Sequence, residues 1–128
     1  MTPEEAARRW ADVWAHGWRE HDVDAIAALY APDAVHHSAP FRDAGSPRGY
    51  VEWAFADEQE AEVWFGDPVV AGERAAVSWW AVSTTSSGDE SLAGVSMLRF
   101  DADGLVTEQL DYWNMEPGRR EPHVHFDR

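Results

Sequence analysis

Residues 92–115 constrain the fold more than any other stretch of the chain. Two runs of mostly apolar residues flank an acidic, glycine-containing segment at residues 101–104, a pattern typical of a β-hairpin. The second run carries Asp111 among large apolar side chains. Aspartate is depleted in strands because its side chain competes for backbone hydrogen bonds and is costly to bury. We therefore expect Asp111 either on a solvated face of the sheet or at a position suited to chemistry.

Composition limits the size of the protein and the classes of its partners. With 128 residues, of which 45% are hydrophobic, the chain can build one substantial core. We predict a single domain over residues 1–116 and a polar tail over residues 117–128. The net charge of −14 argues against nucleic acid and anionic membranes as partners, since both repel an acidic surface. The absence of cysteine excludes disulfides, thiolate metal sites and a cysteine nucleophile.

The N-terminal sequence and the hydropathy of the chain bear on its location. The opening MTPEEAARRW lacks the apolar run of a signal peptide, and no stretch is apolar for the roughly 18 residues that a membrane span needs. The sequence predicts neither secretion nor a membrane span. A cytoplasmic location is expected.

Three helices are predicted in the first half of the chain. Thr2, Pro3 and the acids that follow form a helix-start signature. Trp10, Trp14 and Trp18 then recur at helical spacing, which indicates an apolar stripe that packs on a sheet and that could also line a pocket for a flat ligand. Capping residues and prolines set the other boundaries. The predicted helices cover residues 2–20, 23–30 and 46–58.

Short runs of alternating or apolar residues predict strands. One short strand lies between the second and third helices, and four more follow the third helix in antiparallel order. Helices followed by such a meander favour an α+β fold in which a bent sheet wraps around a helix layer and encloses a ligand site. Four acids within residues 57–62 are interpreted as a solvated face. The predicted strands cover residues 34–39, 63–70, 75–85, 92–100 and 105–115.

Two motifs carry a resemblance to a known family. The sequence GVSMLRFDADGLVTEQLDYW at residues 94–113 and the sequence DVDAIAALYAPDAV at residues 22–35 occur in the order and spacing of the nuclear transport factor 2-like (NTF2-like) superfamily. More narrowly, they resemble SnoaL-like polyketide cyclases and ketosteroid isomerase-like proteins. The resemblance implies a cone-shaped fold, with three N-terminal helices packed on a strongly bent, mostly antiparallel sheet that encloses a pocket. It also implies a homodimer that buries the outer face of the sheet.

Strand alternation leaves open which face of the last strand lines the pocket. Thr107, Gln109, Asp111 and Trp113 share one face, and Leu110 and Tyr112 lie on the other. The resemblance places the first set in the cavity. By the same rule only one of the paired histidines at positions 36 and 37 can point inward. Carrying this register to the other elements puts the following residues on the cavity side: Trp14, His36, Ser38, Trp79, Ala81, Ser83, Leu92, Gly94 and Ser96.

The classical catalytic sets of the superfamily are absent. The positions that match the tyrosine and two carboxyl groups of ketosteroid isomerases hold Trp14, Ser38 and Ser96. Of the Asp-Arg-Asp set of limonene epoxide hydrolases, only the carboxylate at Asp111 is kept, because Trp79 and Ala81 stand at the other two positions. The resemblance is therefore nearest to SnoaL-like cyclases, which use a carboxylate in an aromatic pocket without cofactor or metal.

Asp111 and His36 are the candidate catalytic residues. Neighbouring indoles would strip water from the Asp111 carboxylate, so that it could take up and return a proton near neutrality. His36 could hydrogen-bond Asp111 or donate to an enolate oxygen of the substrate. No cofactor and no metal are expected. The candidate substrate-binding residues are Trp14, Tyr30, Ser38, Trp53, Trp79, Ser96 and Trp113.

Two functional hypotheses follow from these residues. The first is a cofactor-independent lyase, isomerase or cyclase that acts on a flat, hydrophobic, carbonyl-containing substrate. The alternative is a non-catalytic module for small-molecule binding or dimerisation, in which the same aromatic pocket binds and no residue reacts. For Asp111 itself, the alternative is that it faces a dimer interface or pairs with an arginine such as Arg99. His123 and His125 could contribute to a metal site only if other ligands joined them.

Overall fold

The long first helix begins at the predicted capping signature. In the computed structural model, which describes residues 1–123 and Phe126, helix α1 spans Pro3–Glu20. The Glu5 backbone N–H donates to Thr2 Oγ1 at 3.1 Å, and the Thr2 N–H donates to the Glu5 carboxylate at 2.9 Å. This reciprocal capping box satisfies two donors that a helix start leaves free. The helix turns its tryptophans toward the sheet, and Trp10 and Trp14 are buried in the core.

The two shorter helices end earlier than predicted. Helix α2 covers only Val23–Ala27, because strand β1, Tyr30–His37, already begins at Tyr30, where it pairs with Val106. Helix α3, Pro47–Phe55, starts at the predicted cap Ser46 but stops before Glu58, which opens the next strand. In both places sheet pairing supplies hydrogen bonds that a further helical turn would otherwise provide.

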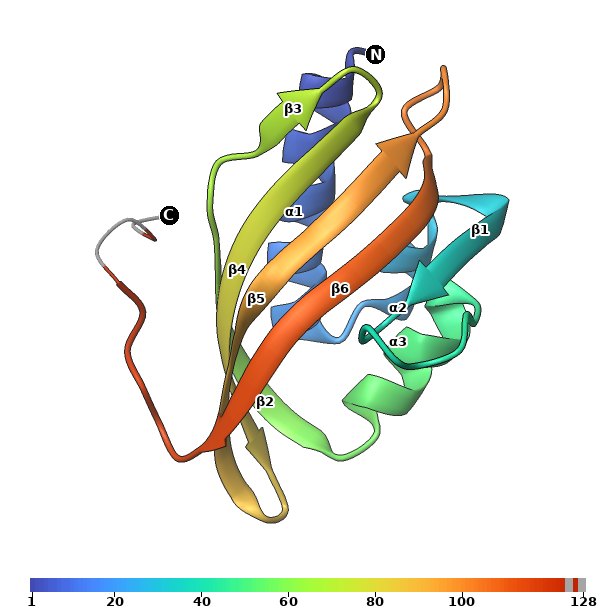
Figure 1. Cartoon of the computed structure of the whole chain (residues 1–128). Helices are drawn as coiled ribbons and strands as arrows, with labels where there is room; N and C mark the ends of the chain where they lie inside the picture. Colours follow the sequence, from blue (N-terminus) through green and yellow to red (C-terminus); the bar gives the residue numbers. More distant parts are fainter. Residues whose placement is uncertain (124–125, 127–128) are drawn as a thin grey trace.

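Six strands form one curled sheet in the order β1-β6-β5-β4-β2, with β3 also paired to β4 (Figure 1). All pairs are antiparallel except β1 with β6. The predicted strand 63–70 is two strands, since the chain leaves the sheet at Gly66 and Pro68 lacks an N–H to donate. The remaining strands are β2, Glu58–Phe65; β3, Val69–Ala71; β4, Arg74–Thr85; β5, Gly88–Phe100; and β6, Val106–Pro117.

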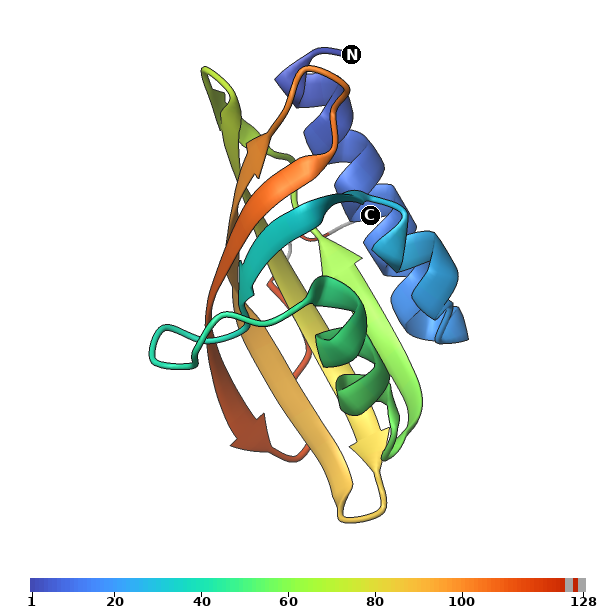
Figure 2. The same ribbon diagram turned by 90° about the vertical axis from the view of Figure 1, so that its right-hand side faces the viewer.

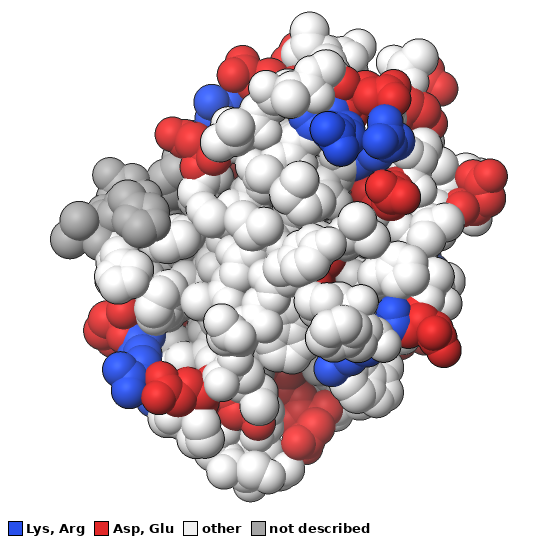
Figure 3. Space-filling model, viewed as in Figure 1, with Lys and Arg blue, Asp and Glu red and all other residues white. Residues whose placement is uncertain are grey.

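The helices lie on one face of this sheet, as the expected α+β arrangement requires (Figure 2). Val77, Ala81 and Leu98 point to the helix side and are buried in the core. The opposite, outer face is open: uncharged side chains cover its middle, and Arg, Asp and Glu gather at its margins (Figure 3). Tyr112 on this face is 48% exposed. No helix in the described part of the chain is both long and apolar enough to span a membrane.

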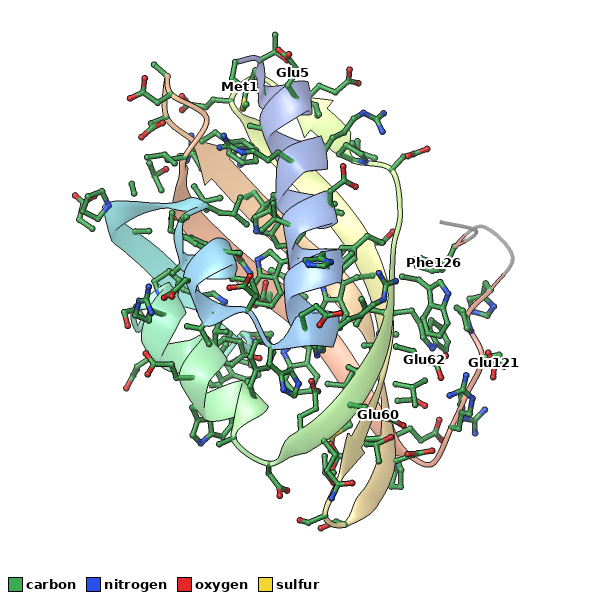
Figure 4. All side chains as sticks on the ribbon, turned by 180° about the vertical axis from the view of Figure 1, so that it is seen from behind. Met1, Glu5, Glu60, Glu62, Glu121 and Phe126 are labelled. Atoms are coloured by element: carbon green, nitrogen blue, oxygen red, sulfur yellow. The ribbon has the colours of Figure 1, made fainter. Side chains whose placement is uncertain are left out.

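The segment after β6 folds back beside β2 and β4. The Arg119 guanidinium donates to both carboxylate oxygens of Glu62 at 2.9 Å, and the Trp80 indole N–H donates to the Arg120 carbonyl at 2.9 Å. Phe126 is buried against Trp80, and Figure 4 shows Phe126 and Glu121 on the same side of the molecule as Glu62. Of the two histidines considered as partial metal ligands, His125 lies outside the described residues.

Candidate functional site

A cavity of about 500 Å³ lies between the concave face of the sheet and helices α1 and α3. Aromatic rings form most of its wall, and polar groups are gathered at two places along it. The aromatic lining residues are Trp10, Trp14, Trp18, Tyr50, Trp53, Phe55, Phe65, Trp79 and Trp113. The charged and polar lining residues include Arg42, Asp57, Glu58, Ser83, Glu90, Ser96, Gln109 and Asp111.

Asp111 lies in the wall of this cavity with its side chain 9% exposed. Its Oδ1 accepts hydrogen bonds from the Ser96 hydroxyl at 2.6 Å and from the Gln109 amide at 2.9 Å. Its Oδ2 lies 2.8 Å from His36 Nε2. These three contacts hold the carboxylate in one orientation. The alternative pairing with Arg99 is wrong, because Arg99 binds Glu73 at 2.7 Å on the outer face.

His36 reaches Asp111 because β1 runs parallel to β6 with His36 opposite Gln109. Its side chain is 1% exposed, and Nδ1 is buried without a partner among the described residues. A carboxylate can only accept, so Nε2 carries the hydrogen, and a neutral ring leaves only a lone pair at Nδ1. His36 borders a second hollow of about 460 Å³, together with Ser38, Arg42 and Tyr50. His36 therefore contacts Asp111 of the main cavity and also borders this second hollow.

A hydrogen-bonded network behind the wall fixes the orientation of Gln109. The indole N–H of Trp10 donates to Gln109 Oε1 at 3.2 Å, and the Tyr30 hydroxyl donates to the same oxygen. Because these donors occupy the amide oxygen, the amide NH₂ must face Asp111. Tyr30 also accepts from Trp14 Nε1 at 2.9 Å, and burial raises the pKa of Tyr30 well above its usual range. Tyr30 therefore lies behind the cavity wall and does not line it, unlike the expectation from the sequence.

Tyr50 and Arg42 belong to the site although sequence reasoning missed them. The Tyr50 ring meets His36 edge to face at 4.9 Å and borders both hollows. Burial, aided by the charge of Asp111, raises the pKa of Tyr50 to about 12. Its hydroxyl has no hydrogen-bond partner within the described chain, so it is a neutral donor available to a ligand. The Arg42 guanidinium lies 5.5 Å from the ring centroids of both Trp53 and Trp113.

The indole N–H groups of two predicted ligand contacts are already occupied. Trp79 donates to Ser96 Oγ at 3.1 Å, and Trp113 donates to the Ser38 carbonyl at 2.6 Å. The rings therefore offer apolar surface, not hydrogen bonds, to a ligand. Of the predicted binding residues, Trp14, Trp53, Trp79, Ser96 and Trp113 line the main cavity, whereas Ser38 borders the second hollow.

Glu58 corrects the interpretation of residues 57–62 as a solvated face. Its side chain is only 6% exposed and lines the main cavity. The sequence does not distinguish Glu58 from the neighbouring acids, because local composition does not reveal that the end of α1 covers Glu58. Among the described residues, no three His, Asp or Glu side chains converge in a way that could hold a metal ion.

Several solved structures are similar to this chain. PrhC from Penicillium brasilianum NBRC 6234 has a TM-score of 0.75 at 16% identity, covering 88% of this chain and 83% of that chain. RV0760c from Mycobacterium tuberculosis has a TM-score of 0.75 at 19% identity, with 91% and 98% covered, and another structure of it contains estradiol-17beta-hemisuccinate. A putative SnoaL-like polyketide cyclase from Shewanella denitrificans OS-217 has a TM-score of 0.68 at 18% identity, with 84% and 89% covered.

An NTF2-like protein from Exiguobacterium sp. 255-15, with a TM-score of 0.69 at 14% identity and 85% and 98% covered, shares the fold, which confirms the expected NTF2-like architecture. No curated protein matches the sequence. The sequence model of the SnoaL-like domain family matches residues 7–109, and the chain therefore belongs to this family.

Proposed function

We propose that the protein is a cofactor-independent isomerase, cyclase or lyase that moves a proton next to the carbonyl group of a flat, hydrophobic substrate. The observation that carries this proposal is the buried Asp111 carboxylate, hydrogen-bonded to His36 inside an aromatic cavity. A volume of about 500 Å³ lies within the range of small-molecule sites. RV0760c with its bound steroid hemisuccinate supports a flat ligand of this size class.

In the first step Asp111 acts as general base. It takes a proton from the carbon next to the carbonyl, the electrons of the C–H bond form the enolate, and the negative charge moves to the carbonyl oxygen. Tyr50 supplies a neutral hydroxyl for that oxygen, and the nearby Arg42 adds positive charge. Placed donors of this kind act where charge develops and are worth more in a site that excludes water.

In the second step the proton returns. Delivery to a different carbon isomerises the substrate, whereas attack of the enolate carbon on a second carbonyl closes a ring, and the proton then goes to the new alkoxide. His36 holds Oδ2 of Asp111 and orients the carboxylate.

Exchange of the α-protons of 2-tetralone tests the proposal, because this flat aromatic ketone enolises readily. We expect wild-type protein in D₂O to accelerate deuterium incorporation over buffer, and Asp111→Asn to lose at least about 100-fold of that acceleration. Asp12→Asn makes the same change on an exposed turn of α1 and is expected to keep the wild-type rate. Exchange at the buffer rate in wild-type protein would reject catalysis.

The competing function is a non-catalytic binding module, which the loss of the classical catalytic residues at Trp14, Ser38 and Ser96 favours. Tryptophan fluorescence separates the two functions. A binding module would show saturable quenching by 2-tetralone in both wild-type protein and Asp111→Asn, with exchange at the buffer rate in both.

The outer face of the sheet is proposed to bind a second copy of the chain in the cytoplasm. Val95, Met97, Leu110 and Tyr112 leave apolar surface on this face, and the charged residues lie at its edges (Figure 3). Sedimentation equilibrium of wild-type protein and Met97→Asp tests this. A dimer that Met97→Asp dissociates is expected, and a monomeric wild-type protein would exclude the pairing.

A further inference from the structure

The far end of the cavity holds a second buried carboxylate, that of Glu58. Its Oε1 lies 3.0 Å from Trp18 Nε1 and 2.8 Å from His21 Nε2, and its Oε2 accepts from the Ser83 hydroxyl at 2.5 Å. Trp18 also lies 3.1 Å from Oε2. These contacts occupy most of the acceptor positions of a carboxylate. Glu58 therefore offers a ligand its charge and little hydrogen-bonding capacity.

This end of the cavity is distant from the Asp111 dyad. Ser96, which binds Asp111, pairs with Val77 on β4, and Ser83 follows six residues later on the same strand. At about 3.3 Å per residue this is ~20 Å along β4. Figure 2 shows that the end of α3 and the start of β2 lie at the same end of the molecule as the β4–β5 hairpin.

The Glu58 end of the cavity carries three acidic side chains, whereas Asp111 at the other end lies with Arg42. Asp57 and Glu90 line the cavity beside Glu58, and Glu90 pairs with Ser83 across the β4–β5 ladder. His21, with its side chain 28% exposed, is the basic group in contact with Glu58. The lining residues include one arginine, Arg42, and it is held by the rings at the opposite end.

Indole rings stand around the acidic end. Trp18 meets Trp14 at 6.1 Å and Trp79 at 5.8 Å between ring centroids, both in edge-on geometry, and Phe55 stacks on His21 at 4.6 Å. An onium group gains from the faces of such rings and from a nearby negative charge, and it requires no hydrogen-bond acceptor. That combination fits a carboxylate whose acceptor positions are already filled.

We propose that this acidic, aromatic end selects substrates that carry a quaternary ammonium group at the end opposite the reacting carbonyl. The inference rests on the cavity being the ligand site of the proposed function and adds the substrate class. Glu58 then determines specificity through its charge, and Asp111 performs the chemistry at the other end of the cavity.

Two isosteric probes isolate the charge. Both probes are ethers of 6-acetyl-2-naphthol. The first is the choline ether, which ends in a trimethylammonium group, and the second is the 3,3-dimethylbutyl ether, which ends in an uncharged tert-butyl group. Dissociation constants come from quenching of tryptophan fluorescence at low salt. We expect the ammonium probe to bind wild-type protein at least about tenfold more tightly than the neutral probe, and Glu58→Gln to bring the ratio near one.

Ser83→Ala is the matched control for a purely structural role of Glu58. This substitution removes the Ser83–Glu58 hydrogen bond, one of those that link α1, β2 and β4, but keeps the Glu58 side chain. The preference for the ammonium probe over the neutral probe is therefore expected to persist. Thermal unfolding of each variant verifies that it is folded. Equal affinities in wild-type protein, or a preference that Glu58→Gln leaves intact, would overturn the inference. Asp111→Asn is expected to keep the preference while losing proton exchange, so failure of the catalytic proposal is seen separately.

Discussion

Replacing Tyr30 with phenylalanine tests the network that supports the candidate site. The substitution keeps the buried ring and removes one hydroxyl, which is the hydrogen-bond acceptor of the Trp14 indole. Trp10 keeps Gln109 as its acceptor, so one buried N–H is orphaned, which costs about 1–3 kcal/mol. The lost Tyr30–Gln109 hydrogen bond adds about 1 kcal/mol. We expect the free energy of unfolding to fall by about 2–4 kcal/mol.

Urea unfolding followed by far-ultraviolet circular dichroism measures this loss. With an unfolding entropy of about 2.1 cal/mol/K per residue, the midpoint of thermal unfolding should fall by roughly 7–15 °C. Asp12→Asn changes an exposed side chain of α1 and should change stability by less than about 0.5 kcal/mol. If Tyr30→Phe were as stable as Asp12→Asn, the network would not contribute as argued.

Further substitutions test the packing of Gly94 and the pH dependence that Tyr50 contributes to stability. Gly94→Ala would place a Cβ 2.2 Å from the Tyr112 carbonyl oxygen and 2.7 Å from Trp113 Cα, so it should cost about 2 kcal/mol or more in urea unfolding, whereas Gly45→Ala meets nothing within 4 Å and should be near neutral. Tyr50, whose pKa is raised to about 12, keeps its proton in the folded state while the unfolded chain loses it above about pH 10. Stability should therefore decline between pH 10 and 12, and Tyr50→Phe should reduce that decline; an unchanged decline would refute the assignment.

Local chemistry made parts of the fold predictable from sequence. The Thr2 and Ser46 caps act within one turn of their helices, so their signatures were sufficient to place both helix starts. Strand alternation, once one face was chosen, set the register that brings Ser96 opposite Asp111. It also implied that one of two adjacent histidines points inward, and His36 does so while His37 binds the Arg42 carbonyl at the surface.

The residues that sequence reasoning missed depend on contacts between distant elements. Glu58 lies in an acidic run, and its burial arises from Trp18 and His21, about 40 residues earlier in the chain. Tyr50 follows the apolar pattern of a helix, which does not reveal that its hydroxyl meets a cavity. The sequence places Gln109 two residues before Asp111 on the same face of the strand. The orientation of its amide, however, depends on hydrogen bonds from Trp10 and Tyr30.

The most direct test of the central claim is the stereochemistry of proton exchange at C1 of 2-tetralone. A base fixed in the cavity wall removes and returns a proton on one face of the ligand, whereas buffer attacks both faces. We predict that wild-type protein in D₂O produces mainly the singly deuterated C1 before the slower buffer reaction adds a second deuterium, and that Asp111→Asn abolishes the fast phase. Equal incorporation of both deuterium atoms, or a fast phase that persists in Asp111→Asn, would contradict proton transfer by Asp111.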